Sequence, residues 1–342
     1  MGEAVSWRAA MTEALYGAEG FFRRPDGGAA AHFRTSAIAS PLFGTAILRL
    51  LVAVDEALGR PGRLDLIDIG AGSAHLLRRL AILAPAYMAQ RMHLGAVEVT
   101  ARPMDLPDHI AWYDRLPPPG SVTGLLLATE WLDNVPLDIA QVDDAGSLRY
   151  VVVEPATGHE VVGGHVAEAD AAWATRWWSE TPWKEGTRVE LGGPRDEAWA
   201  SAVASLGRGV ALTVDYGHMW YDRPPAGTLT GFRAGRATLP VLDGSCDITA
   251  HVAVDAVCAS GEAVAGRAAA LITQRQALQG LGVDSTRPPL VLANRDPAGY
   301  VRALSAATQA AELMDTDGLG GHYWVLQPVG IDPEGLPEGL RP

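Results

Sequence analysis

Residues 64–75 read Leu-Asp-Leu-Ile-Asp-Ile-Gly-Ala-Gly-Ser-Ala-His, a short apolar run that stops at two glycines before a helical pattern begins. The run over 64–69 predicts a strand buried on both faces, as in a parallel sheet covered by helices. Gly70 and Gly72 predict a tight turn at which a ligand can approach bare backbone. Ser73 is a natural cap for a helix over 74–84, whose unpaired N–H groups would face the turn. The stretch therefore predicts a nucleotide-type site at the tip of a first strand.

The turn also bears on the class of nucleotide. A dinucleotide fingerprint reads G-x-G-x-x-G/A, and its sixth position here is His75, a bulky residue that argues against the close packing that supports a pyrophosphate. The start Asp68-x-Gly70-x-Gly72 is similar instead to the first motif of class I S-adenosylmethionine (SAM) methyltransferases. We expect Asp68, Gly70, Ala71 and Gly72 to bind the amino-acid end of SAM; another nucleotide site or a plain tight turn are the alternatives.

The composition indicates a soluble globular protein. The 342 residues are 48% hydrophobic, enough for one large domain or two. Forty acidic residues against 27 basic ones give a net charge of −13. This balance disfavours nucleic acid and anionic membranes as partners, because both demand positive patches. A basic protein segment or a cationic small molecule fits better.

Cysteine usage predicts a reduced, cytoplasmic setting. Cys246 and Cys258 cannot form a disulfide framework and lack a nearby pattern of metal ligands, so we expect no metal site. Residues 1–15 carry no signal pattern and no run of ~18 uncharged apolar residues occurs, so we expect neither secretion nor membrane insertion. Lys184 is the single lysine, which indicates a GC-rich bacterial genome.

Residues 1–62 predict an N-terminal lid and helices. Aromatic and polar residues gather at 16–22 and 32–36 outside any amphipathic period. They either pack on the domain or form a lid over the cofactor, and we expect Arg34 and Ser36 to touch it. Ser40-Pro41 then opens a helix with a broad apolar face.

A second strand over 94–99 ends in an acid. Glu98 is well placed to accept both ribose hydroxyls, because a carboxylate offers two acceptor oxygens, and Val99 adjoins it. The alternative is a surface or capping carboxylate. The connection over 100–109 contains two prolines and is too short for a crossover helix. A third strand follows at 110–112, and Tyr113 at its end is a candidate for contact with the adenine.

Two later strands also end in groups that can do chemistry. The strand over 122–128 leads to Glu130 and Asp133, and ligands collect outside the carboxyl ends of parallel strands. We expect both carboxylates to be catalytic, although Asp133 could cap a helix and Glu130 fix a loop. His218 follows the strand over 209–214 and is a candidate general base, since its ordinary pKa is near ~6.5; a structural role is the alternative.

These elements predict an α/β fold, a mostly parallel Rossmann-like sheet with helices on both faces. The core would comprise 63–136 and 209–330, interrupted at 137–208 by an inserted cap subdomain whose tryptophans line a substrate groove or fill a satellite core. Asp247 would cap one helix, and Asp296-Pro297 would open another that runs to Leu313. The Gly/Pro/Glu-rich residues 331–342 predict a disordered tail.

Seven motifs in one order resemble those of the MidA-like family of SAM-dependent methyltransferases. They are Tyr-Gly-x-x-Gly-Phe-Phe (16–22), His-Phe-Arg-Thr-Ser (32–36), Asp-Ile-Gly-Ala-Gly (68–72), Val-Glu-Val-Thr (97–100), Glu-Trp-Leu-Asp-Asn-Val-Pro (130–136), Val-Asp-Tyr-Gly (214–217) and Asp-Ile-Thr-Ala-His-Val (247–252). This family includes a mitochondrial complex I assembly factor that methylates a protein arginine. The matches span roughly residues 12–330.

The resemblance implies a class I methyltransferase domain with SAM as the methyl donor. Gly70 and Gly72 would hold the methionine end of SAM, Glu98 the ribose, and Glu130 would lie where donor and acceptor meet. The acceptor would be a protein or peptide side chain, arginine among the candidates, or a small molecule. The family's Pro-Glu-Ile-Ser is Ala-Ile-Ala-Ser at 37–40, so an acid is missing.

Two rival functions and one open question accompany this interpretation. A nucleotide-dependent oxidoreductase is disfavoured by His75 and by the absent third glycine. A SAM-binding assembly factor without catalysis would use the tryptophan-rich insertion for docking. The sequence leaves a homodimer open.

Overall fold

The computed structural model describes residues 3–24, 35–178, 183–233 and 235–342. Its centre is a seven-stranded sheet in the order β16-β17-β10-β5-β2-β3-β4. The strands from β10 to β4 are parallel, and β17 runs antiparallel to both of its neighbours. The strands are β2 (Leu64–Ile69), β3 (Met92–Val97), β4 (Ile110–Tyr113), β5 (Val122–Thr129), β10 (Leu206–Asp215), β16 (Ala270–Thr273) and β17 (Tyr323–Val329). The prediction of a mostly parallel α/β sheet is confirmed.

The register of the central strands brings their carboxyl ends to one edge. Ile69 in β2 lies opposite Ala128 in β5, and Thr129 lies opposite Val214 in β10. The glycine turn after β2, the segment after β5 and the end of β10 are therefore neighbours. Lower in the sheet the same strands approach closely: a Cβ on Gly124 would lie 2.0 Å from the carbonyl oxygen of Asp65. A Cβ on Gly209 would lie 1.9 Å from the carbonyl oxygen of Gly124.

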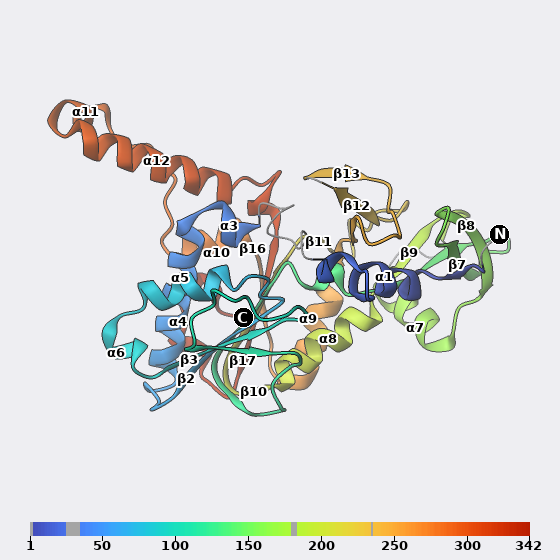
Figure 1. The fold of residues 1–342 in the computed structure, drawn as a ribbon, viewed down its shortest axis with the longest axis horizontal. Helices are drawn as coiled ribbons and strands as arrows, with labels where there is room; N and C mark the ends of the chain where they lie inside the picture. Colours follow the sequence, from blue (N-terminus) through green and yellow to red (C-terminus); the bar gives the residue numbers. More distant parts are fainter. Residues whose placement is uncertain (1–2, 25–34, 179–182, 234) are drawn as a thin grey trace.

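Helices cover both faces of the sheet (Figure 1). One face packs with a large apolar core against α4 (Pro41–Ala57), α5 (His75–Leu83), α10 (Gln274–Gly280) and the end of α12 (Pro297–Leu313). The other packs against α8 (Gly193–Ala204) and α9 (Val254–Ala265). Shorter helices are α3 (Ser36–Ala39), α6 (Ala86–Ala89) and α11 (Leu290–Arg295), with 3-10 turns η1 (Phe21–Arg23), η2 (Leu132–Asn134) and η3 (Leu319–Gly321). Among the described residues, no helix has both the length and the apolar character needed to span a bilayer.

The helix α4 shows why these elements form where they do. The side chain of Ser40 accepts the backbone N–H of Leu42, and Pro41 occupies the first turn, as expected for a capped helix start. Its apolar face is fully buried under the sheet, and each such side chain contributes roughly 2 kcal/mol on burial. The predicted helix after Ser40 is confirmed.

A second sheet forms a separate layer at one end of the molecule (Figure 1). Its strands are β1 (Val5–Ser6), β6 (Asp138–Val142), β7 (Leu148–Glu154), β8 (His159–His165) and β9 (Arg188–Leu191). The N-terminal α1 (Trp7–Tyr16) packs on it with an apolar cluster of its own, and α7 (Glu168–Trp177) covers another part. Trp173, Trp178 and Trp183 belong to a small apolar cluster there, as the satellite-core interpretation expects. The helix α8, although within 137–208, packs on the large sheet because Trp199 and Val203 are buried against it.

One predicted helix start and one predicted helix cap are wrong. Residues 247–249 form the strand β14 (Asp247–Thr249), which pairs with β12 (Thr230–Arg233), and the helix α9 begins only at Val254. The carboxylate of Asp247 is buried against Asn134 and caps nothing, so a tertiary contact overrides the local signal. Ser73 is likewise no cap: Ala74 holds that position in the left-handed region, with a φ of 57° and no side-chain hydrogen bond. The remaining small strands are β11 (Gly217–His218), β13 (Arg236–Thr238) and β15 (Val252–Ala253).

The C-terminal residues 331–342 are ordered, so the predicted disordered tail is wrong. The segment forms the 3-10 turns η4 (Pro333–Gly335) and η5 (Glu338–Leu340) and buries Ile331, Leu336 and Leu340 in the main core. These residues are 4%, 2% and 0% exposed. Three apolar side chains at spacings of four and five residues anchor a segment whose other residues are polar, proline or glycine.

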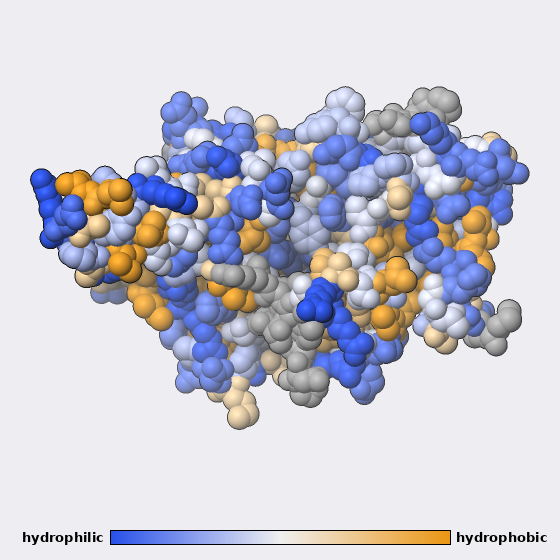
Figure 2. Space-filling model, turned by 90° about the horizontal axis from the view of Figure 1, so that it is seen from above, coloured by the Kyte–Doolittle hydropathy of each residue, from blue (hydrophilic) through white to orange (hydrophobic). Residues whose placement is uncertain are grey.

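The helices α11 and α12 project from the body as an arm (Figure 1). The helix α11 has no buried residue, and Leu290, Val291 and Val301 are 75%, 51% and 65% exposed. Apolar surface is visible at this end of the molecule in Figure 2. Only the base of α12 enters the core, through Ala307, Ala310 and Leu313.

Replacing Leu340 by alanine tests the packing of the tail. The variant Leu340→Ala should lower the free energy of unfolding by about 2–4 kcal/mol, because it leaves a cavity in the main core. The exposed neighbour Glu338 supplies the matched control, and Glu338→Ala should change the free energy of unfolding by less than about 0.5 kcal/mol. Urea unfolding measures both; equal stability of the two variants would show that the tail does not dock.

Candidate active site at the carboxyl edge of the sheet

The glycine turn after β2 is closed by the acid at the end of the next strand. One carboxylate oxygen of Glu98 accepts the backbone N–H of Gly72 at 2.8 Å, and the other accepts the N–H of Val99 at 2.7 Å. Burial raises the pKa of Glu98, and these backbone N–H groups oppose the increase. The carboxylate therefore lies directly over the turn, where sequence reasoning expects a ribose.

Asp68, inside β2, is a buried acid without a full set of partners. Its side chain is 3% exposed, and its Oδ1 atom is buried without a hydrogen bond among the described residues. Burial raises its pKa to about 7, and the charge of Glu98 adds to the increase. Asp68 is two residues before Gly70, so this buried acceptor without a donor lies next to the glycine turn. It is suited to an incoming N–H or ammonium group.

The space over the turn suits a ligand. A Cβ built on Gly72 would have no atom within 4 Å, so the backbone there is open. On the other side the indole of Trp131 covers Gly70, with its Cδ1 atom 3.0 Å from a Cβ built on that glycine. The residues fit a SAM molecule: open backbone at the turn, an acid over it for hydroxyl groups and an unsatisfied buried carboxyl behind it. Because Trp131 follows Glu130 in sequence, the turn and the segment after β5 form one site.

Glu130 is held in an uncommon backbone conformation. Its φ is 50°, in the left-handed region that non-glycine residues seldom occupy, and its N–H donates to the carbonyl of Val214 at 2.7 Å. Among the described residues its carboxylate accepts one hydrogen bond, from the N–H of Ser36 at 3.1 Å. Burial raises its pKa to about 7; the Ser36 bond opposes this and the charge of Asp133 adds to it. Strained backbone and a raised pKa together are typical of functional carboxylates.

Three further buried acids surround the same point. Asp133 accepts the hydroxyl of Tyr216 at 2.5 Å and that of Thr249 at 3.1 Å, while its other oxygen has no partner within the described chain. Asp215 accepts the backbone N–H groups of Leu132 and Asp133 at 3.0 and 3.2 Å. Asp247 accepts the side-chain amide of Asn134 at 2.7 Å.

Burial raises the pKa of each of these three acids. The pKa of Asp247 rises to about 8, with a contribution from the charge of Asp133. That of Asp215 lies well above its ordinary value, because burial and the charges of Asp133 and Glu130 act together. That of Asp133 is raised by burial against the opposing bonds from Tyr216 and Thr249 and the charge of Arg195. Several carboxyl groups so close together cannot all ionise without a cation among them.

Among the described residues the buried cation at this site is Arg195, and its hydrogen bonds go to backbone carbonyls. Its guanidinium is 1% exposed and donates to the backbone carbonyls of Asp133, Val135, Ala250 and His251. It favours ionised Asp133, Glu190 and Asp215 through its charge, while burial lowers its own pKa. It ties η2 to the β14–β15 segment, so the carboxylates are left without a direct cationic partner in the described chain.

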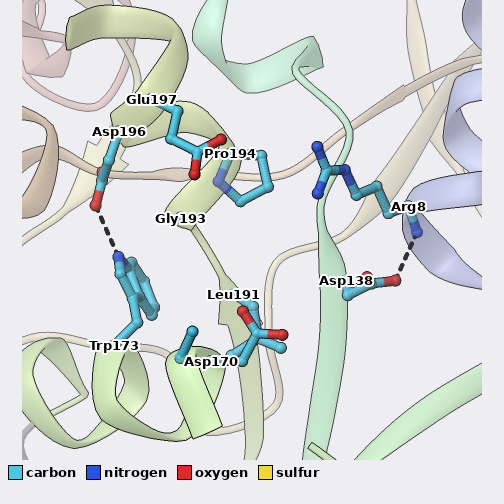
Figure 3. A pocket seen from close by; sticks show the side chains of 10 residues that line it. Arg8, Asp138, Asp170, Trp173, Leu191, Gly193, Pro194, Asp196 and Glu197 are labelled. Atoms are coloured by element: carbon cyan, nitrogen blue, oxygen red, sulfur yellow. Dashed lines mark hydrogen bonds between the residues drawn. The ribbon is translucent and has the colours of Figure 1, made fainter. Parts of the chain in front are cut away.

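A hollow of about 90 Å³ opens among these acids. It is lined by Thr35, Glu130, Asp133, Asn134, Tyr216, Phe232 and Asp247. A larger hollow of about 320 Å³ lies elsewhere, between α1, α7 and the start of α8 (Figure 3). There Asp196 already pairs with the indole of Trp173 at 2.7 Å, and Asp138 accepts the backbone N–H of Arg8 at 2.9 Å. The smaller hollow is lined by Glu130, the residue before the Trp131 whose indole covers Gly70, and is therefore the candidate for chemistry.

Most of the predicted residues lie around this edge. Val99 and Tyr113 are 46% and 44% exposed beside Glu98, whose N–H donates to the carbonyl of Tyr113 at 2.9 Å. Ala71 lies in the turn itself. Ser36 is 1% exposed and contacts Glu130 through its N–H. Arg34 lies outside the described residues.

His218 is separated from the other predicted catalytic residues. Its ring is 3% exposed, packs edge-on against Trp178, and receives the guanidinium of Arg223 on Nδ1 at 2.6 Å. His218 does not line the hollow that contains Glu130 and Asp133.

Sequence reasoning missed three residues of the hollow's surroundings as site residues: Asp215, Tyr216 and Asp247. Asp215 and Tyr216 follow the carboxyl end of a predicted strand. Glu130 is predicted as a site residue on the same criterion, so this signal could have found them. Asp247 instead gives a convincing helix-cap signal, and only the fold shows that it faces Asn134. Within the described ranges no group of His, Cys, Asp or Glu is arranged to hold a metal ion.

Comparison with known proteins identifies the family. Residues 46–273, two thirds of the chain, match the family model described as "Putative S-adenosyl-L-methionine-dependent methyltransferase". Comparison with curated proteins finds no match.

Two solved structures from Burkholderia thailandensis share the fold. One, a COG1565 superfamily member bound to S-adenosyl-homocysteine, is 24% identical with a TM-score of 0.76, over 97% of this chain and 89% of that one. The other, a native structure of a COG1565 superfamily protein, is 24% identical with a TM-score of 0.75, over 99% and 91%. With the family match over most of the sheet and its insertion, the chain belongs to this family of S-adenosyl-L-methionine-dependent methyltransferases, and SAM is its cofactor.

Proposed function

We propose that the protein transfers the methyl group of SAM to a positively charged side chain of a protein or peptide, with arginine as the leading candidate. The observation that carries this proposal is the acid-lined hollow next to the glycine turn. Its three carboxyl groups, Glu130, Asp133 and Asp247, have raised pKa values and no direct cationic partner among the described residues. A cationic acceptor would satisfy all three.

The proposed acceptor fits both the charge and the chemistry of the hollow. A guanidinium offers five N–H donors and keeps its proton up to a pKa above ~12, so ionised carboxylates must localise its charge and take up the proton released on transfer. Tyr216 and Asn134 supply neutral polar groups at the rim, and Phe232 an apolar wall. A small hollow of about 90 Å³ admits the end of a side chain and not a folded surface.

The protein's part in the reaction is alignment and proton acceptance. When bound, SAM supplies a methyl group on a sulfonium, which needs no protein nucleophile. Gly70 and Gly72 would receive its amino-acid end, Asp68 would accept from its ammonium, and Glu98 would accept from its ribose hydroxyls. Glu130 would orient the acceptor nitrogen and take its proton, and Asp133 would share the acceptor's positive charge.

The acid that the resemblance to the MidA-like family leads us to expect at residue 38 is replaced here by an isoleucine that is 39% exposed. Without that acid, selection of arginine would have to come from Glu130, Asp133 and Asp247. A small cationic metabolite would satisfy the same three groups, so peptides and free amines belong in one assay.

Glu130→Gln should abolish methyl transfer and leave cofactor binding intact. The amide cannot take the proton, so transfer from labelled SAM to peptides carrying arginine, lysine or histidine as the single nucleophile should fall at least ~100-fold. In the wild type, transfer should rise with pH through about 7, where Glu130 ionises. Calorimetry with S-adenosyl-homocysteine should give affinities within about threefold of the wild type.

The surface variant Glu56→Gln is the matched control, because Glu56 lies on α4 in an exposed pair with Arg60. It should leave transfer and affinity unchanged. Unaltered turnover in Glu130→Gln would remove Glu130 from the chemistry. If free amines were labelled and no peptide was, the acceptor would be a small molecule and not a protein.

Asp68→Asn should stabilise the protein at neutral pH and weaken SAM binding. The pKa of Asp68 is about 7 in the folded state, above its unfolded value, so the wild type loses stability as pH rises from about 4 to 7. The variant should lose about 2–3 kcal/mol less between pH 5 and 8, since one pKa unit corresponds to ~1.4 kcal/mol and about two units separate pH 5 from the folded pKa. Urea unfolding at both pH values measures this effect, and calorimetry should show SAM affinity reduced roughly tenfold. If the free energies of unfolding of the wild type and of Asp68→Asn changed equally between pH 5 and 8, Asp68 would be ionised over that whole range.

A further inference from the structure

The Glu130 carboxylate stands at one end of a buried chain of hydrogen bonds that runs through Ser36 to Gln274. The carboxylate accepts from the N–H of Ser36, the first residue of α3. The hydroxyl of Ser36 in turn donates to Oε1 of Gln274 at 3.1 Å. Both Ser36 and Gln274 are buried, at 1% and 0% exposed. The backbone carbonyl of Thr35 accepts the N–H groups of Ile38 and Ala39, its side chain makes no cap, and the hydroxyl bond of Ser36 is a side-chain bond that ties the start of α3 to α10.

The amide of Gln274 is fixed in one orientation. Its Oε1 also accepts the indole N–H of Trp324 at 3.3 Å, and its Nε2 donates to the carbonyl of Leu313 at 3.1 Å. Its backbone N–H donates to the carbonyl of His322 at 2.7 Å. A flipped amide would place N–H groups against the indole N–H and an oxygen against a carbonyl, so this side chain has a single satisfied state.

We propose that Gln274 is a positioning residue for methyl transfer: through the hydroxyl of Ser36 it fixes the backbone N–H that directs the Glu130 carboxylate toward the hollow. This inference rests on the proposed function. Gln274 does not line the hollow, so it would act only through Ser36. The sequence gives no hint of this role, because Gln274 and Glu130 are 144 positions apart and share no motif.

The inference predicts how Glu130 titrates. The Ser36 bond favours the ionised carboxylate, so loosening Ser36 should raise the pKa of Glu130. The other groups that face it are Asp133 from η2, whose charge also raises its pKa, and Asp215 at the end of β10. Asp247 of β14 and Tyr216 line the same hollow. Within the described chain none of these groups is hydrogen-bonded to Gln274, so a change at Gln274 reaches Glu130 through Ser36.

The test is a ¹³C NMR titration of Glu130 in the full chain with S-adenosyl-homocysteine bound. Glutamate carboxyl carbons are labelled, and the Glu130 signal is the one that disappears in Glu130→Gln. Gln274→Met keeps the length of the side chain and removes its hydrogen bonds; it should raise the Glu130 midpoint by at least about 0.5 pH unit. Gln279→Met is the matched control, since Gln279 is exposed on the same helix, and it should leave the midpoint unchanged.

Ser36→Ala provides a second, independent arm. It keeps the backbone N–H and removes the hydroxyl, so it should raise the midpoint in the same direction, and the double variant should add little to either single change. An unmoved midpoint in a folded Gln274→Met or Ser36→Ala variant would overturn the inference. The titration needs no methyl acceptor, so its outcome is independent of the proposed function. The proposed function is tested separately, and full turnover by Glu130→Gln would contradict it.

Discussion

The parallel register of β2, β5 and β10 is the constraint on which the site depends. It places the ends of three strands at one edge, so that the glycine turn, Glu130 and Asp215 become neighbours although they are far apart in the sequence. The bond from the N–H of Glu130 to Val214 extends this pairing by one residue and holds Glu130 in the left-handed region. The strain is thus maintained by the sheet, which buries apolar side chains on both faces.

The same edge concentrates carboxyl groups in a place that water reaches poorly. Asp68, Glu130, Asp133, Asp215 and Asp247 all have raised pKa values with burial as the first cause. Arg195 donates to backbone carbonyls, which fixes the segments that carry the acids and leaves these acids without a direct cationic partner among the described residues. Such an arrangement costs folding stability and is retained where a ligand completes it.

The sequence predicts the fold well because its strongest signals are local. The helix after Ser40 and the helix after Asp296 follow from caps and apolar faces, and the structure confirms them. Prediction fails where a distant partner overrides a local signal: Asp247 faces Asn134, and Leu340 docks from a tail of loop-like composition. The edge position of Glu98, Glu130 and Asp133 follows from strand ends. The roles of Arg195 and Gln274 could not be predicted from the sequence, because both depend on carbonyl groups supplied by other elements.

The close approach of β2, β5 and β10 at Gly124 and Gly209 has a genetic consequence. A side-chain atom at either position would overlap a neighbouring carbonyl oxygen within the sheet itself, so no rotamer could relieve the clash. Glycine codons share their first two bases, and every change in those bases introduces a side chain or a stop. Two codons of this gene should therefore drift only at their third base, whatever methyl acceptor its product comes to use.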